Sequence, residues 1–189
     1  MTEAREWTEE LVAQYYEIQG YLVLRDVPTT TGQGGGRADA DVLAFKIDKG
    51  TPVLRHVEVG TYYESASTIV GKLKKKFGKG QRLKVQTLVR KYLGLRTNAR
   101  LEYSSQFVDA GGLSEEILTE IRQKLSTQGV EITDIWTLIE DIPHQIEAWQ
   151  ERETTDKGTP PMLPRSYDLL NVVLASQWVW TQITPSRTG

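Results

Sequence analysis

The stretch Arg37–Gly60, RADADVLAFKIDKGTPVLRHVEVG, sets the expected fold of this 189-residue chain. Strand-forming residues run from both sides up to the turn formers Asp48–Thr51, which predicts two antiparallel strands joined by a short turn. Side chains alternate between the two faces along a strand. If the hairpin closes symmetrically about the centre of the turn, Asp41 therefore lies directly opposite Glu58 on one face of the sheet.

Two carboxylates placed in this way call for a physical reason. Directly opposed residues have Cβ atoms roughly 5 Å apart, so Asp41 and Glu58 repel each other unless a cation or a shared proton lies between them. A hard divalent cation is the partner that such oxygen ligands favour. Asp39 shares the face of Asp41 and is a candidate supporting acid. His56 shares the face of Glu58 and is interpreted either as a contact to a phosphate or as a polar packing contact.

The pattern also resembles a known protein family. Asp41-Val-Leu-Ala, a hairpin and then Val-Glu-Val resemble the core of the PD-(D/E)XK nuclease superfamily, in which an Asp on one strand precedes a Glu-X-Lys on the next. Asp41 and Glu58 match the Asp and the Glu, whereas Gly60 stands at the Lys position. The resemblance implies that Asp41 and Glu58 bind Mg2+ or Mn2+ for catalysis. It also implies an assisting lysine, for which Lys72 on the following helix is the first candidate and Lys76 the alternative.

The same resemblance implies a further acidic residue near the start of the chain. In the family, a helix that ends in Gly-Tyr or Gly-Phe carries a Glu that reaches the metal site, and here a helix over 6–19 ends at Gly20. Glu9 is the closest match in spacing and is the expected catalytic acid, with Glu10 as the alternative. The competing explanation is that the helix dipole alone favours Glu in the first turns of a helix.

The order of the expected elements indicates an α/β fold. The hydrophobic spacing predicts, in this order, a helix over 6–19, a strand over 21–27, the hairpin, a helix over 65–77, a helix between Gly80 and Gly94, a strand over 99–108, a helix over 113–129, a strand over 130–139 and a helix over 143–153. A strand-helix-strand unit implies a right-handed parallel crossover. The expected fold class is α/β with a restriction-endonuclease-like core, in which helices flank a mixed central sheet. The nuclease-like domain is expected over 1–153, and the family resemblance covers about 6–140.

A linker over 154–164 and a C-terminal helix and tail over 165–189 are expected to follow this domain. The helix is apolar nearly all round, so it must be buried against its own domain or against a second copy of the chain. Cutting both strands of a duplex with one site per chain usually needs two chains, and two-fold pairing is the commonest symmetry. We therefore expect a homodimer in which this helix contributes to the interface, with packing on its own core as the alternative.

Basic residues are concentrated in one segment of the chain. From Lys72 to Arg100 there are eleven basic and no acidic residues, although the whole chain has a net charge of −2. Such a segment is typical of a surface that binds a phosphate backbone, and a solvated helix face without a partner is the alternative. The residues expected to contact DNA are Lys72, Lys74, Lys75, Lys76, Lys79, Arg82 and Lys84.

The composition argues against several other classes of protein. The chain has no cysteine, which excludes a disulfide framework and a cysteine-based zinc site. It has no apolar run of about 18 residues for a membrane span, and its charged N-terminus lacks the apolar centre of a signal peptide. A cytoplasmic, intracellular location without membrane contact is therefore expected. The glycine-rich segment Pro28–Arg37 lacks the Gly-Lys-Ser/Thr ending of a nucleotide-binding loop and is interpreted as a flexible connector.

Three function hypotheses follow. The first is a metal-dependent endonuclease that hydrolyses DNA phosphodiester bonds, of the restriction or junction-resolving type. The second is a catalytically degenerate module, with Gly60 in place of the lysine, that binds nucleic acid or a protein partner without cleavage. The third is a small homodimer whose basic face is incidental. Metal-dependent cleavage separates the first from the second, and salt-dependent DNA binding separates both from the third.

Overall fold

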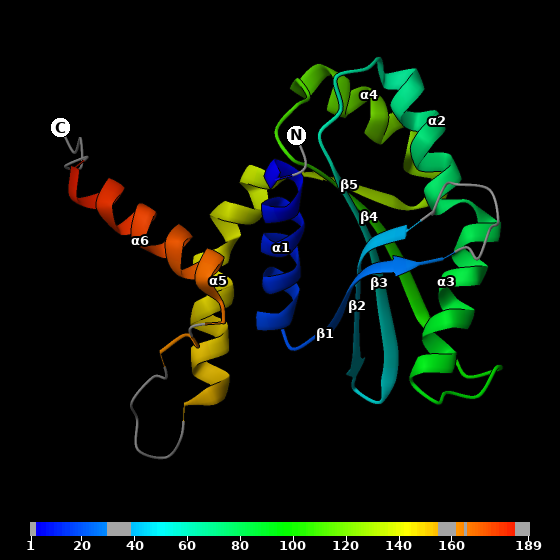
Figure 1. Cartoon of the computed structure of the whole chain (residues 1–189), viewed down its shortest axis with the longest axis horizontal. Helices are drawn as coiled ribbons and strands as arrows, with labels where there is room; N and C mark the ends of the chain where they lie inside the picture. The colour runs from blue at the N-terminus through cyan, green and yellow to red at the C-terminus, as the bar shows by residue number, and fades with distance from the viewer. Residues whose placement is uncertain (1–2, 30–38, 155–161, 165, 184–189) are drawn as a thin grey trace.

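A five-stranded mixed sheet lies between layers of helices in the computed structural model of the chain (Figure 1). The structure describes residues 3–29, 39–154, 162–164 and 166–183. In their order across the sheet, the strands are β1 (Leu22–Pro28), β2 (Asp39–Asp48), β3 (Thr51–Gly60), β4 (Glu102–Asp109) and β5 (Val130–Asp134). β2 pairs antiparallel with both β1 and β3, whereas β4 and β5 continue the sheet parallel to β3. The predicted α/β class, with helices flanking a mixed sheet, is confirmed.

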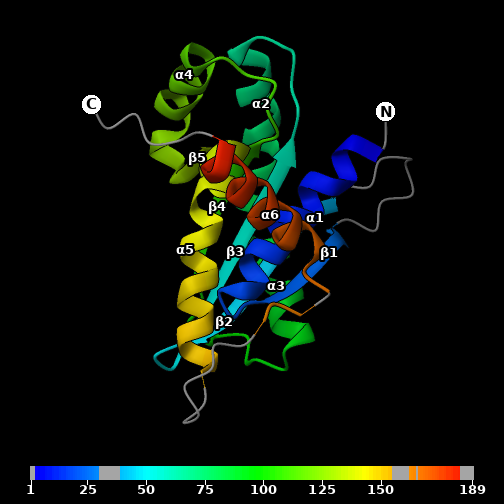
Figure 2. The same cartoon turned by 90° about the vertical axis from the view of Figure 1, so that its left-hand side faces the viewer.

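Helices cover both faces of the sheet. α1 (Glu3–Ile18) and α5 (Ile135–Glu153) pack on one face, and α2 (Ala66–Phe77), α3 (Lys79–Tyr92) and α4 (Glu115–Leu125) pack on the other (Figure 1). A short 3-10 helix (Ser126–Gln128) follows α4, and α6 (Asp168–Ile183) crosses the outer side of α1 and α5 (Figure 2). Among the described helices, none combines the length and the apolar composition that crossing a bilayer requires.

The hairpin closes as the sequence predicts. Lys49 and Gly50 have φ angles of 47° and 81°, the left-handed conformation that both central residues of a two-residue type I′ turn adopt. From this turn the two strands pair outward as far as Val42 and Val57. The register therefore places every second residue of β2 and β3 on a common face.

The side chains of the sheet divide into separate cores because they alternate between its faces. Val42, Ala44, Val57 and Val59 are buried against α1 and α5. On the opposite face, one apolar cluster forms around α2 and α4, and a second forms where α3 covers β1, β2 and β3. The second face thus has a boundary between two clusters near the middle of β3.

The structure corrects one predicted boundary. The sequence predicted that the last strand would continue to Ile139 and that the next helix would begin at Pro143. Instead β5 ends at Asp134, whose carboxylate accepts a 2.9 Å hydrogen bond from the backbone N–H of Thr137. This contact caps the N-terminus of α5. The helix then runs through Pro143, with buried residues at helical spacing: Ile135, Leu138, Ile142 and Ile146.

The first half of α6 packs against the chain's own core. Leu170 is fully buried in the cluster that includes α1 and α5, and its backbone N–H donates a 3.3 Å hydrogen bond to the side chain of Gln14 on α1. The side chains over 177–183, most of the predicted linker and the glycine-rich loop beyond Thr29 lie outside the described residues. The homodimer therefore stays a prediction, while packing on the core holds for the first half of the helix.

Candidate active site

The hairpin of β2 and β3 brings Asp41 and Glu58 together. Val42 and Val57 are the last paired residues, and Asp41 and Glu58 occupy the next position along each strand. Both acidic residues are buried, with 5% and 4% of their surface exposed. The backbone N–H of Val59 donates a 2.8 Å hydrogen bond to Asp41 Oδ2. This bond ties the Asp41 carboxylate to β3, beside Glu58.

Both oxygens of the Glu58 carboxylate have a partner. His56 Nε2 lies 2.8 Å from Oε1, and Lys76 Nζ lies 2.5 Å from Oε2. His56 is fully buried on β3. Lys76 belongs to the last turn of α2, and 29% of its side chain is exposed. The site therefore combines two carboxylates, an imidazole and an ammonium group, and Lys76 connects it to the surface.

The electrostatics of the site favour an added positive charge. Burial and the neighbouring Glu58 carboxylate raise the pKa of Asp41 from 3.8 to about 7, whereas Lys76 and the Val59 N–H oppose this rise. Burial alone lowers the pKa of Lys76, but Glu58 and Asp41 outweigh it and raise that pKa above its ordinary value. Lys76 therefore stays charged. Whenever both carboxylates are ionised, the single ammonium leaves a net negative charge in a buried place, which a bound cation would relieve.

Of the two candidate lysines, Lys76, the alternative, contacts Glu58, whereas Lys72 contacts Glu64. Lys72 Nζ lies 2.6 and 2.8 Å from the two oxygens of the exposed Glu64 and 5.2 Å from the ring centroid of Tyr62. The prediction assumed that the start of the helix, which follows β3, lies nearest the site. Instead the connection over 61–65 continues past the end of the sheet before α2 turns back, so the end of α2 lies beside Glu58 (Figure 1).

An aromatic ring covers Gly60, the position at which the family resemblance expects a lysine. A Cβ atom added at Gly60 would lie 3.2 Å from Tyr62 Cε2. The Tyr62 ring also packs on Phe107, with 5.5 Å between ring centroids. Burial and then the charge of Glu58 raise the pKa of the Tyr62 hydroxyl. Tyr62 therefore belongs to the surroundings of Glu58 and fills space that a side chain from Gly60 would need.

The two acidic candidates on α1 have different surroundings. Glu9 raises the pKa of Asp41 through its charge, so it lies within electrostatic reach of the site. Glu10 instead forms an ion pair of 2.9 Å with Arg25. Glu9 is therefore the better candidate of the two. Asp39 lies in β2, but its side chain is outside the described part of the structure.

His56 lies at the boundary between the two apolar clusters of this face. Its ring packs edge-on against Phe77 of α2 and Tyr103 of β4, with centroid distances of 5.0 and 6.2 Å. The Tyr103 hydroxyl lies 2.8 Å from His56 Nδ1. The sequence places His56 on the face of Glu58, but it gives no signal for Tyr103, because no local pattern shows which residue of β4 stands beside it.

The acidic pair suits a cation that needs few protein ligands. Within the described residues, no group of three or more His, Cys, Asp or Glu side chains could hold a metal ion. Mg2+ is usually bound by one or two carboxylates together with water and substrate phosphates. Asp41 and Glu58 meet that requirement, and Mn2+ accepts the same oxygen ligands.

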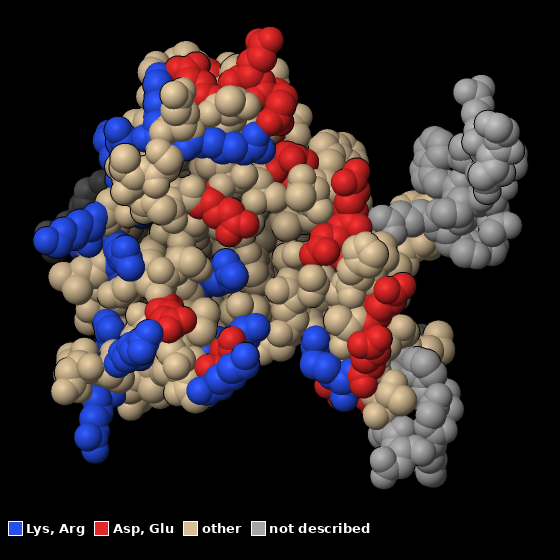
Figure 3. Space-filling model, turned by 180° about the vertical axis from the view of Figure 1, so that it is seen from behind, with Lys and Arg blue, Asp and Glu red and all other residues tan. Residues whose placement is uncertain are grey.

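Basic side chains are concentrated on one side of the molecule. Lysine and arginine residues gather on the side of the molecule formed by α2 and α3, whereas acidic residues are more frequent on the opposite side (Figure 3). Five of the exposed basic residues on α2 and α3 are here called the basic surface: Lys74, Lys75, Lys79, Arg82 and Lys84. Lys74 and Lys75 share the last turn of α2 with Lys76, which contacts Glu58.

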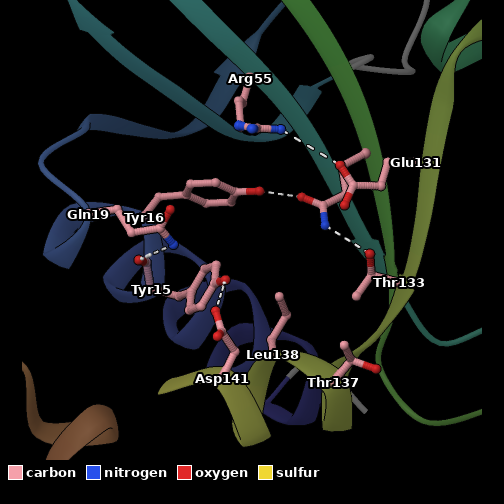
Figure 4. Close-up of a pocket in the computed structure, with 10 residues that line it drawn as sticks. Tyr15, Tyr16, Gln19, Arg55, Glu131, Thr133, Thr137, Leu138 and Asp141 are labelled. Atoms are coloured by element: carbon pink, nitrogen blue, oxygen red, sulfur yellow. Dashed lines mark hydrogen bonds and ion pairs between the residues drawn. The ribbon is translucent and has the colours of Figure 1, made fainter. Parts of the chain in front are cut away.

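A cavity of about 340 Å3 lies on the opposite face of the sheet, between α1, α5 and the strands (Figure 4). Its polar groups bond to one another. The Tyr16 hydroxyl donates to Gln106 Oε1, and Gln106 Nε2 donates to Thr133 Oγ1 at 3.0 Å. The Tyr15 hydroxyl donates to Asp141 Oδ2 at 2.6 Å. This network stabilises the contact between α1, α5 and the sheet.

Comparison with known proteins adds no further assignment, because no protein-family model and no curated protein matches the chain.

Proposed function

We propose that this protein is a metal-dependent endonuclease of the PD-(D/E)XK type, which hydrolyses DNA phosphodiester bonds and belongs to the restriction or junction-resolving class. The observation that carries the proposal is the buried Asp41–Glu58 pair with the Lys76 ammonium 2.5 Å from Glu58. Burying a charged cluster of this kind costs free energy, and such clusters are concentrated at functional sites.

Each group of the site has a role in this proposal. Asp41 and Glu58 would hold Mg2+ or Mn2+, which supplies a water of lowered pKa and stabilises charge on the phosphate. Lys76 stays protonated, is partly exposed and presents three N–H donors, so it can hold a phosphate oxygen beside the acidic pair. It replaces the lysine missing at Gly60. Glu9 adds negative charge near Asp41.

The basic surface gives the proposed substrate a means of binding. Lysine and arginine neutralise backbone phosphates and release their counterions, without reading the base sequence. Lys76 is partly exposed and contacts Glu58, so a backbone phosphate bound to Lys76 would lie close to the acidic pair.

A cleavage assay tests the proposal. Supercoiled plasmid, linear duplex and four-way junction DNA are incubated with the protein in Mg2+, Mn2+ or a chelator. We expect metal-dependent cleavage of at least one substrate, abolished by Asp41→Asn and strongly reduced by Lys76→Met. The matched control Glu64→Gln, which alters an exposed ion pair nearby, should retain cleavage. Equal activity of the wild type and Asp41→Asn would contradict the assignment.

A second function has an observation in its favour. Because Gly60 lacks a side chain and Lys76 already pairs with Glu58, the cluster is partly neutralised without metal. A module that binds nucleic acid without cutting it is consistent with this arrangement. It predicts salt-dependent DNA binding in the absence of cleavage. The logarithm of the binding constant should fall linearly with the logarithm of the salt concentration, with a slope of about −0.9 per phosphate contact on duplex DNA. Charge reversal at Lys74 and Lys75 should flatten the slope, whereas Lys49→Glu at the hairpin turn should not.

The homodimer is also part of the proposal, since two copies would supply one site for each strand of a duplex. Val172 on α6 is 62% exposed and lies next to the helix segment that packs on the core. Light scattering at micromolar concentration should give a dimer mass for the wild type and a monomer mass for Val172→Asp. A wild-type monomer would contradict dimer formation and leave the assignment of the active site unchanged.

A further inference from the structure

The strongest unexplained feature of the site is the buried His56. It is fully buried, and both ring nitrogens have partners: Nε2 lies 2.8 Å from Glu58 Oε1, and Nδ1 lies 2.8 Å from the Tyr103 hydroxyl. Its ring is packed against Phe77 and Tyr103. A buried imidazole with both nitrogens paired and its ring packed has a fixed orientation.

The partners determine where the proton of a neutral His56 lies. An ionised Glu58 carboxylate can only accept a hydrogen bond, so Nε2 must carry the hydrogen and donate it. Nδ1 is then the acceptor and takes the hydrogen of the Tyr103 hydroxyl. The chain Tyr103, His56, Glu58 therefore has one consistent direction of donation, which ends on the carboxylate.

Tyr103 is itself held in place. The guanidinium of Arg82, on the basic surface, lies 4.5 Å from the centroid of the Tyr103 ring. Arg82 thereby covers the tyrosine whose hydroxyl fixes His56. The chain of contacts runs from an exposed cation on α3 through two aromatic side chains to a buried carboxylate.

We infer that His56 is a positioning residue for the proposed nuclease site: it holds Glu58 Oε1 so that the carboxylate faces Asp41, with Tyr103 fixing the imidazole. This inference rests on the proposed function, because its expected consequence is a change in the affinity for a divalent cation. Groups that orient a ligating side chain in this way change metal affinity by about 10- to 100-fold when they are removed.

Metal titration of designed variants tests the role. Calorimetry with Mn2+ and no DNA compares the wild type with His56→Phe, which keeps the ring but removes both hydrogen bonds. It also includes His56→Gln, whose amide nitrogen can replace Nε2, and His56→Asn, whose amide replaces only Nδ1. We expect Mn2+ affinity to fall about 10- to 100-fold in the Phe and Asn variants and to be largely restored in the Gln variant.

Thermal unfolding of each variant separates positioning from packing. If Mn2+ affinity falls in proportion to lost stability in all three variants, including Gln, His56 is a structural residue and the inference is wrong. Unchanged Mn2+ affinity in His56→Phe also overturns it.

A measurement without metal keeps this test apart from the test of the proposed function. Long-range 1H–15N spectra of the metal-free protein should show the Nε2–H tautomer of His56. The Nδ1–H tautomer would leave no proton for Glu58 and overturns the inference. A wild-type protein that shows the Nε2–H tautomer but does not bind Mn2+ contradicts the metal-dependent function and supports the orientation of Glu58 by His56.

Discussion

The two faces of the sheet both bury polar groups, but they do so in different ways. On the α1–α5 face, Tyr16, Gln106 and Thr133 form a network in which neutral donors meet acceptors. On the opposite face, Asp41 and Glu58 place two acids side by side, and burial together with Glu58 raises the pKa of Asp41 to about 7. In the first arrangement each polar group has a hydrogen-bond partner. In the second, two acidic groups repel each other, and the charge of one lysine only partly compensates for that repulsion.

This contrast offers a way to separate structural from functional polar residues. A closed network of neutral hydrogen bonds contributes to stability and specificity of packing. A buried pair of acids costs stability and persists where chemistry requires it. A cavity of about 340 Å3 lies on the first face, whereas our proposal places the reaction on the second face.

The largest expected effect concerns cleavage. Glu58→Gln and Asp141→Asn each replace a carboxylate by an amide of similar size, one on each face. We expect Glu58→Gln to reduce cleavage by roughly a hundredfold to a thousandfold, the size of effect that removal of a single stabilising group in an active site has. Asp141→Asn should leave the rate within about twofold, because Asp141 contacts Tyr15 in the other region. Initial rates at saturating Mg2+ measure both.

A folded Asp141 variant that loses cleavage as strongly as the Glu58 variant would reverse the roles of the two faces, since the active region would then lie on the face of α1 and α5.

The next effect is on stability and its pH dependence in metal-free protein. The pKa of Asp41 is raised from 3.8 to about 7 on folding, so the native state binds more protons than the unfolded state between these values. Stability therefore falls as pH rises through this range, by roughly 2–4 kcal/mol at about 1.4 kcal/mol per pKa unit. Asp41→Asn should remove this loss and be more stable than the wild type at pH 8.

Denaturant unfolding at pH 5 and pH 8 measures the effect, and Tyr16→Phe is the control. Burial raises the pKa of Tyr16 above its ordinary value, so its hydroxyl stays neutral throughout and the variant should keep the wild-type pH dependence. If the free energy of unfolding depends on pH in the same way for the wild type and Asp41→Asn, charge repulsion within the acidic pair does not destabilise the protein.

A smaller effect is expected from breaking the neutral network. Tyr16→Phe removes the hydroxyl that donates to Gln106, a residue that is only 4% exposed. An acceptor left buried without its partner costs about 1–3 kcal/mol, and cleavage should be unaffected. Urea unfolding at pH 7 gives the free energy difference. A loss below about 0.5 kcal/mol would show that water in the adjacent cavity replaces the hydroxyl.

The smallest effects are expected at the rims of the two regions. Lys72 and Glu64 form an ion pair with side chains 46% and 42% exposed, and Arg55 lies 3.7 Å from Glu131, which is 58% exposed. Exposed pairs of this kind contribute about 0–1 kcal/mol. Lys72→Met and Glu131→Gln should therefore change thermal stability little. A large loss of stability in either variant would show that its exposed ion pair is a stabilising part of that region.

Short-range rules applied to the sequence were enough to predict the α/β order, the hairpin and the common face of Asp41 and Glu58. Those rules are strand alternation, turn formers and hydrophobic spacing. Because the turn fixes the register, the amino-acid order alone places two acids that are many residues apart opposite each other.

The choice of the other residues that join the pair depends on tertiary packing. Lys76 rather than Lys72 reaches Glu58 because the connection after β3 passes the end of the sheet before α2 returns. His56 acquires its partner because β4 sets Tyr103 beside it. β5 stops at Asp134 because that side chain caps α5, which buries its apolar residues against α1. Each outcome depends on contacts between segments that are distant in the sequence. Local sequence patterns do not predict these contacts, because their energies arise only when the segments pack together.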